Sequence, residues 1–130
     1  MNAPLRTPSP LPRAATALAG LLLLSGITHV AQLAVYRHEA NVLGAAGFGA
    51  VYFMIGVAIL RRWPAALPLA AVLPTVGGLL GVFRFFFLHT NPFSVWHVAL
   101  DLVIVPLAVT LMARRRAQAP DAPAGAPSAL

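Results

Sequence analysis

The chain contains four long apolar stretches, each sufficient to cross a lipid bilayer as a helix. The hydrocarbon core of a bilayer requires about 20 consecutive apolar residues in helical form. Only short polar segments separate the stretches, at 37–41, 61–64 and 89–92, so consecutive helices must be adjacent and antiparallel. The sequence therefore predicts an all-α, polytopic membrane protein, a four-helix up-down-up-down transmembrane bundle. We expect the transmembrane domain to cover residues 14–113, with spans over 14–36, 42–60, 65–88 and 93–113.

Composition and charge favour the same class. Of the 130 residues, 59% are apolar and only 9% are charged, a balance that ordinary soluble domains do not have. The net charge of +6 comes from arginines that cluster at chain ends and bends, which is typical of membrane topology and predicts no nucleic-acid partner. The chain has no cysteine, which excludes disulfides, thiol redox chemistry and cysteine-ligated metals.

The two ends of the chain are predicted to be tails. Repeated prolines predict a disordered tail over residues 1–13, and a basic stop followed by a disordered tail over 114–130. Arg37 is the one arginine expected on the far side of the membrane, and an excess of arginine marks the cytoplasmic side. We therefore expect both termini in the cytoplasm and a multi-pass protein of the cell membrane (plasma or inner membrane). Seven arginines carry this expectation: Arg6, Arg13, Arg61, Arg62, Arg114, Arg115 and Arg116.

Local signals refine two of the helices. Asn41 is placed to cap the second span, and Asn91 before Pro92 has the pattern of a cap followed by a first-turn proline. Gly49 and Gly56 are seven residues apart on the second span. We therefore interpret that helix as a close-packing wall for its neighbours.

Five polar side chains inside the spans fall at similar depths. At 1.5 Å per residue, Gln32 lies ~6 Å and His29 ~10 Å below the outer surface. Arg84 lies ~6 Å deep on the third span, and His97 and Asp101 lie ~6 Å and ~12 Å deep on the fourth. Because polar groups in hydrocarbon usually face the bundle interior, we predict that these five side chains form one polar cluster or ligand pocket in the outer half of the membrane.

Arg84 and Asp101 are the only oppositely charged residues within spans. Each alone would cost about 2.5–3.5 kcal/mol on insertion scales, so we expect them to pair. The pair is interpreted either as a structural clasp between the third and fourth helices or as a site in which Arg84 binds an anionic group. A third interpretation is that Arg84 extends outward to lipid phosphates.

The two histidines allow a cofactor hypothesis. His29 and His97 lie on different helices and are residue types that ligate haem b. Together with Asp101 they also form a set of nitrogen and oxygen ligands suited to Zn or Cu(II). The simpler alternative is that each imidazole makes an interior hydrogen bond, His97 with Asp101 and His29 with Gln32 or a carbonyl.

The sequence leaves three functions open. The first is a non-enzymatic accessory or binding protein with the polar pocket as its site, and the second is a haem b or metal-binding redox protein. The third is a small transporter or channel, formed as a homodimer or larger membrane complex because four short helices enclose little volume. An enzyme is not favoured, because the triad residue types Ser25, His29 and Asp101 fall on one helix turn and a separate span. The lipid bilayer is the one expected partner common to all three.

Overall fold

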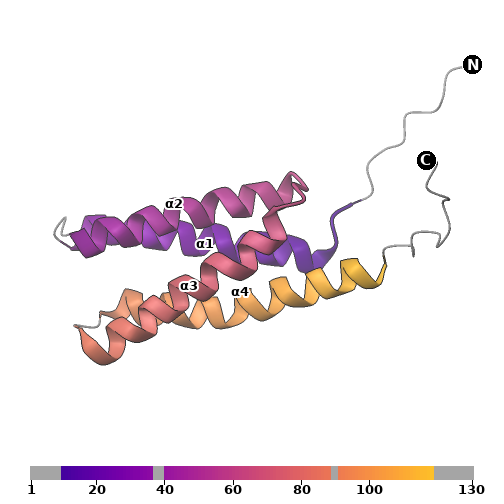
Figure 1. Cartoon of the computed structure of the whole chain (residues 1–130). Helices are drawn as coiled ribbons and strands as arrows, with labels where there is room; N and C mark the ends of the chain where they lie inside the picture. Colours follow the sequence, from indigo (N-terminus) through magenta and orange to yellow (C-terminus); the bar gives the residue numbers. More distant parts are fainter. Residues whose placement is uncertain (1–9, 37–39, 89–90, 119–130) are drawn as a thin grey trace, which may run out of the picture.

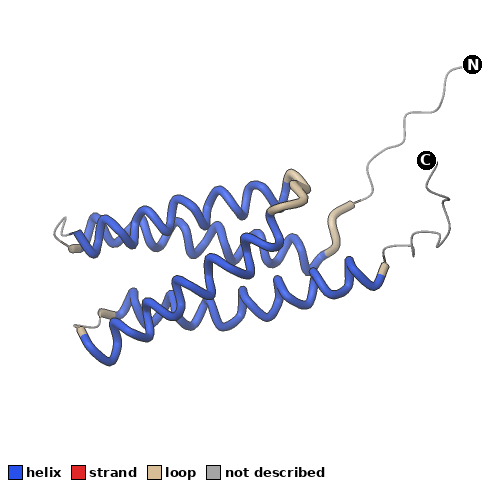
Figure 2. Tube along the Cα trace, viewed as in Figure 1, coloured by secondary structure: helices blue, strands red, loops and turns tan. Residues whose placement is uncertain are grey.

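The computed structural model describes residues 10–36, 40–88 and 91–118, and within these ranges all regular structure is helical (Figure 2). Each of the four helices is long and apolar enough to cross a membrane, as a multi-pass membrane protein requires. The predicted all-helical fold with four candidate membrane spans is therefore confirmed. The helices are α1 (Arg13–Val35), α2 (Ala40–Leu60), α3 (Ala66–Phe87) and α4 (Pro92–Ala117).

The helices form a bundle of two pairs (Figure 1). The most extensive packing is between α1 and α2 and between α3 and α4, with fewer contacts between the pairs. We call the first pair the α1–α2 hairpin and the second the α3–α4 hairpin. The last turns of α1 and α3 and the first turns of α2 and α4 lie at one end of the bundle, which we call the Tyr36 end. The α2–α3 connection lies at the opposite end, which we call the Trp63 end.

The predicted start of the fourth helix is confirmed, whereas that of the second is wrong. The Asn91 side chain accepts a hydrogen bond from the Ser94 backbone N–H at 2.8 Å, and Pro92 occupies the first turn. Asn41 lies inside α2, which begins at Ala40, and its Oδ1 accepts from the next backbone N–H, that of Val42, at 2.9 Å. The Asn41 side chain therefore accepts from a backbone N–H of the first turn, but Asn41 itself is a helical residue and not the N-cap.

The end of α2 is set by a backbone motif. The Trp63 N–H donates to the Ala58 carbonyl at 2.9 Å, and the Arg62 N–H donates to the Ile59 carbonyl at 2.9 Å. This is the Schellman pattern, in which the residue after the cap adopts a left-handed conformation. Arg62 has φ 59° and takes the position usually held by glycine. Pro64 follows and cannot continue the helix.

The fourth helix runs beyond its predicted end at Ala113 to Ala117. Arginine is a good helix former, so Arg114, Arg115 and Arg116 continue the backbone helix while their side chains are exposed. Residues 1–9 and 119–130, which include most of the predicted tails, lie outside the described residues, as does Arg37.

The α1–α2 hairpin is held by close backbone approach. A Cβ built on Gly26 would lie 2.7 Å from the Gly49 carbonyl oxygen, and one built on Gly49 would lie 2.8 Å from the Gly26 oxygen. Only glycine at both positions allows this contact. The predicted close-packing role of α2 is thus confirmed at Gly49, and also at Gly56, where a Cβ would lie 3.1 Å from the Ala19 oxygen.

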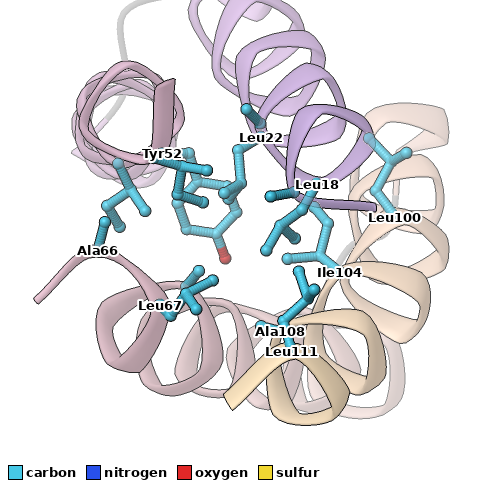
Figure 3. Close-up of a cluster of buried hydrophobic side chains, with 14 residues drawn as sticks. Leu18, Leu22, Tyr52, Ala66, Leu67, Leu100, Ile104, Ala108 and Leu111 are labelled. Atoms are coloured by element: carbon cyan, nitrogen blue, oxygen red, sulfur yellow. The ribbon is translucent and has the colours of Figure 1, made fainter. Parts of the chain in front are cut away.

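The buried core towards the Trp63 end is apolar (Figure 3). Leu18 and Leu22 of α1 meet Leu67 of α3 and Ile104 of α4, and all four side chains are at most 2% exposed. Between helices in lipid, such contacts stabilise through packing more than through water exclusion. In Figure 3 the hydroxyl of Tyr52 points into the centre of this cluster. The apolar core therefore extends from the Trp63 end to Tyr52, where the buried polar contacts begin.

Candidate functional site

Buried polar side chains from three helices lie towards the Tyr36 half of the bundle. Helical spacing explains their common orientation, since residues at i, i+4 and i+7 share one face. On α1 these are Ser25, His29 and Gln32, and on α4 they are His97 and Asp101. Tyr52 of α2 is fully buried and contacts the same group. We call the set the polar cluster: Ser25, His29, Gln32, Tyr52, His97 and Asp101.

The imidazole rings of His29 and His97 stack on each other. Their centroids are 3.3 Å apart and their planes differ by 25°. His29 Nδ1 lies 2.9 Å from the Ser25 carbonyl oxygen; a carbonyl only accepts, so Nδ1 carries the proton and donates. His97 Nε2 lies 3.0 Å from the Thr28 hydroxyl, a contact between α4 and α1. The predicted site histidines are therefore brought together, and both have partners.

Asp101 is joined to α2 by Tyr52. The Tyr52 hydroxyl donates to Asp101 Oδ2 at 3.3 Å and also lies 3.5 Å from the Leu73 carbonyl of α3. The other carboxylate oxygen, Oδ1, is buried and has no hydrogen-bond partner in the part of the chain that the structure describes. Asp101 is 5% exposed. A buried polar atom without a partner is costly and rare, so Oδ1 is the atom of the polar cluster that needs an explanation.

The α3 backbone closes the site on one side. A Cβ built on Gly78 would lie 3.4 Å from Asp101 Cβ and 3.5 Å from Oδ2. A Cβ on Gly77 would collide with the Tyr52 hydroxyl. Because Gly77 and Gly78 have no side chains, the α3 backbone packs directly against the Asp101 carboxylate.

The predicted ion pair of Arg84 with Asp101 is not among the contacts that the structure gives for Asp101, and it stays a prediction. The structure gives Asp101 Oδ2 to Tyr52, and Oδ1 has no partner among the described residues. The reason is helix register: Gly77 and Gly78 face the carboxylate, and Arg84 lies seven residues beyond Gly77, ~10 Å nearer the Tyr36 end. Arg84 is half-buried and is not without a partner.

Gln32, the remaining predicted site residue, lies one turn nearer the Tyr36 end than His29. It is 2% exposed, and its side-chain amide donates to the His29 carbonyl at 3.0 Å. Gln32 therefore bonds the backbone of its own helix, and its hydrogen bond does not reach Asp101.

Sequence reasoning omitted Tyr52 from the site. A depth signal was present, because Tyr52 is ~18 Å from the start of α2 and Asp101 is ~14 Å from the start of α4, so both fall near mid-membrane. A tyrosine hydroxyl buried at that level needs a partner. The relative register of α2 and α4 places Asp101 within reach of the Tyr52 hydroxyl as its acceptor.

The stacked histidines do not have the geometry of metal or haem ligands. Imidazoles that ligate one ion direct ring nitrogens at a common point, whereas His29 and His97 meet face to face at 3.3 Å. Among the described residues, no group of three or more His, Asp or Glu side chains is arranged to hold a metal ion. The proposed set of His29, His97 and Asp101 thus lacks support from its geometry.

Ring contacts connect the Tyr36 end to the middle of the bundle. Tyr36 and Phe93 have centroids 5.9 Å apart, and Phe93 and His97 have centroids 6.3 Å apart. The histidine stack follows, and His29 meets Tyr52 edge-on at 5.4 Å. We call these five side chains the aromatic ladder; it ends where Tyr52 donates to Asp101.

Two apolar cavities lie beside the bundle, away from the polar cluster. Cavities of about 300 and 440 Å³ open on apolar surfaces, one beside Phe86 and Val95 and the other beside Phe53 and Met54. Neither is lined by a side chain of the polar cluster.

The chain matches no protein-family model, no curated protein sequence and no solved structure.

Proposed function

We propose that the chain is a non-enzymatic integral membrane protein that binds a small ligand in the polar cluster. In this proposal the helices cross the cell membrane up-down-up-down, with both termini in the cytoplasm, so that the Tyr36 end faces outward. The observation that carries the proposal is Asp101 Oδ1, a buried carboxylate oxygen that has no hydrogen-bond partner within the described residues. Ionisable groups inside membrane spans are costly and are usually kept for function.

Binding is favoured over hydrolysis by the tautomer of His29. A Ser–His pair in a hydrolase needs an unprotonated ring nitrogen facing the serine hydroxyl. The Ser25 hydroxyl lies 3.4 Å from His29 Nδ1, but that nitrogen donates its proton to the Ser25 carbonyl. His29 is therefore a poor base for Ser25.

Binding is also favoured over transport. The Trp63 half of the bundle is filled by leucine, isoleucine and alanine side chains that exclude water. A pathway would need polar groups through that half. The cluster is thus best understood as a closed-ended site that a ligand enters and leaves from the Tyr36 end.

Single cysteines test this proposal cleanly, because the natural chain has none. We expect Gln32→Cys in intact cells to react with a small membrane-impermeant thiol reagent added outside. Ala108→Cys, which replaces a fully buried residue in the apolar core, is the matched control and should not react from either side. Arg115→Cys should react only when the cytoplasmic face is exposed, which checks the orientation.

Two outcomes would overturn the proposal. If Gln32→Cys were unreactive from both sides, the cluster would be a sealed structural element. If Ala108→Cys reacted as readily as Gln32→Cys, the bundle would contain a continuous pathway, and a channel or transporter would replace the binding protein. Crosslinking of these variants in the membrane would also show whether the chain forms the proposed homodimer or larger complex.

A further inference from the structure

We propose that the ligand of the polar cluster is one small monovalent cation, held at Asp101 and reached along the aromatic ladder. This inference rests on the proposed function and adds the chemical class of the ligand. It follows from the missing partner of Asp101 Oδ1, the close packing of α3 against the carboxylate and the aromatic rings nearby.

Asp101 Oδ1 has no hydrogen-bond partner among the described residues, and protonation does not supply one. As a carboxylate it is 5% exposed with only the Tyr52 hydroxyl as a recorded donor, and a buried charge with so little compensation is strongly disfavoured. As a neutral acid protonated on Oδ1 it would present an O–H donor, yet that atom has no hydrogen-bond partner among the described residues. A bound cation supplies both the opposite charge and the missing contact.

The surroundings limit the ion to small size and single charge. Gly77 and Gly78 bring the α3 backbone against the carboxylate, so little room is left beside it. A divalent ion usually gathers several carboxylate ligands. Asp101 is the one acidic side chain in the cluster, and the described residues contain no group of three or more His, Asp or Glu that is arranged for a metal.

The approach to Asp101 also favours positive charge. The aromatic ladder presents ring faces and edges from Tyr36 and Phe93 through the stacked histidines to Tyr52. Aromatic faces attract cations electrostatically. The ladder contains no arginine or lysine, so its own side chains place no permanent positive charge between the Tyr36 end and the carboxylate.

Thermal unfolding of the full-length protein in mild detergent tests the inference. Chloride salts of Na⁺, K⁺, NH₄⁺ and methylammonium are compared at constant ionic strength with choline, which is too large for the site. We expect at least one small cation to raise the unfolding temperature in a saturable way, with no effect of choline. Asp101→Asn keeps the shape of the side chain and should abolish the shift. Thr75→Val, an exposed position whose hydroxyl bonds its own helix, should keep it.

A second measurement remains informative if Asp101→Asn fails to fold. Gln32→Cys in an otherwise natural chain should react faster with a positively charged thiosulfonate than with a negatively charged one of similar size. The effective small cation should slow that reaction. The reagent and the cation would then both be attracted by the negative charge of Asp101 and by the rings of the aromatic ladder.

Several results would overturn the inference. These are an equal response to every salt including choline, a shift that persists in Asp101→Asn, a response to pH alone, or faster labelling by the negative reagent. If Gln32→Cys still reacts from outside in such a case, only the cation class is wrong. If Gln32→Cys does not react at all, the proposed function itself fails.

Discussion

The rings of His29 and His97 lie face to face, with centroids 3.3 Å apart and planes inclined by 25°. The contact joins α1 to α4, and the nearby contact of His97 Nε2 with the Thr28 hydroxyl at 3.0 Å fixes the orientation of one ring. The two hairpins are therefore held together here by ring stacking and by a side-chain hydrogen bond.

We expect the stacking to appear as a coupling energy. His29→Ala and His97→Ala should each destabilise the protein, and the double variant should lose less than the sum, by about 0.5–1.5 kcal/mol. The measurement is unfolding in mixed micelles. Val109→Ala at a lipid-facing position is the control and should add independently to either change. Strict additivity of the two histidine variants would mean that the rings do not interact.

A second cycle identifies the partner of Asp101. Tyr52→Phe removes the donor to Oδ2 and should cost about 1–3 kcal/mol, since the carboxylate then keeps no recorded donor. In an Asp101→Leu background the same change should cost clearly less, because the acceptor is gone. Arg84→Leu should have the same effect in both backgrounds. Coupling of Arg84 with Asp101, and not of Tyr52, would contradict the observed pairing.

Two glycines of α2 provide a matched pair for helix packing. A Cβ on Gly49 would meet the Gly26 carbonyl at 2.8 Å and collide with the His29 side chain, whereas one on Gly47 has no atom within 4 Å. Gly49→Ala should therefore destabilise the bundle by about 1–3 kcal/mol. Gly47→Ala should be neutral or stabilise α2 by up to ~1 kcal/mol. Equal effects on unfolding would show that α1 and α2 do not pack through Gly49.

The absorption spectrum tests the haem hypothesis. We expect protein purified in mild detergent from haem-supplied cells to show no haem band, because the two imidazoles stack on each other and leave no space for iron between their nitrogens. Elemental analysis of the same sample extends the test to Zn and Cu. A stoichiometric haem band that His97→Phe removes would overturn the stacked arrangement.

The number and approximate limits of the helices follow from sequence because they depend on length and hydropathy alone. The cap at Asn91 was predictable for a similar reason, since it depends only on residues next to it. The depth of His29, His97 and Asp101 was also accessible from the helical rise. Depth does not specify which side chains on different helices touch. That depends on rotation and register, which is why glycines of α3 face Asp101 and Arg84 does not.

The helix pairs differ in what holds them together. The α1–α2 hairpin is joined by glycine backbone contact, whereas the polar contacts Thr28 to His97 and Tyr52 to Asp101 connect one hairpin with the other. The proposed ligand site therefore lies at the contact between the two hairpins. A cation bound there would change the stability of the contact between the α1–α2 and α3–α4 hairpins. Binding would therefore be coupled to the relative positions of the two hairpins.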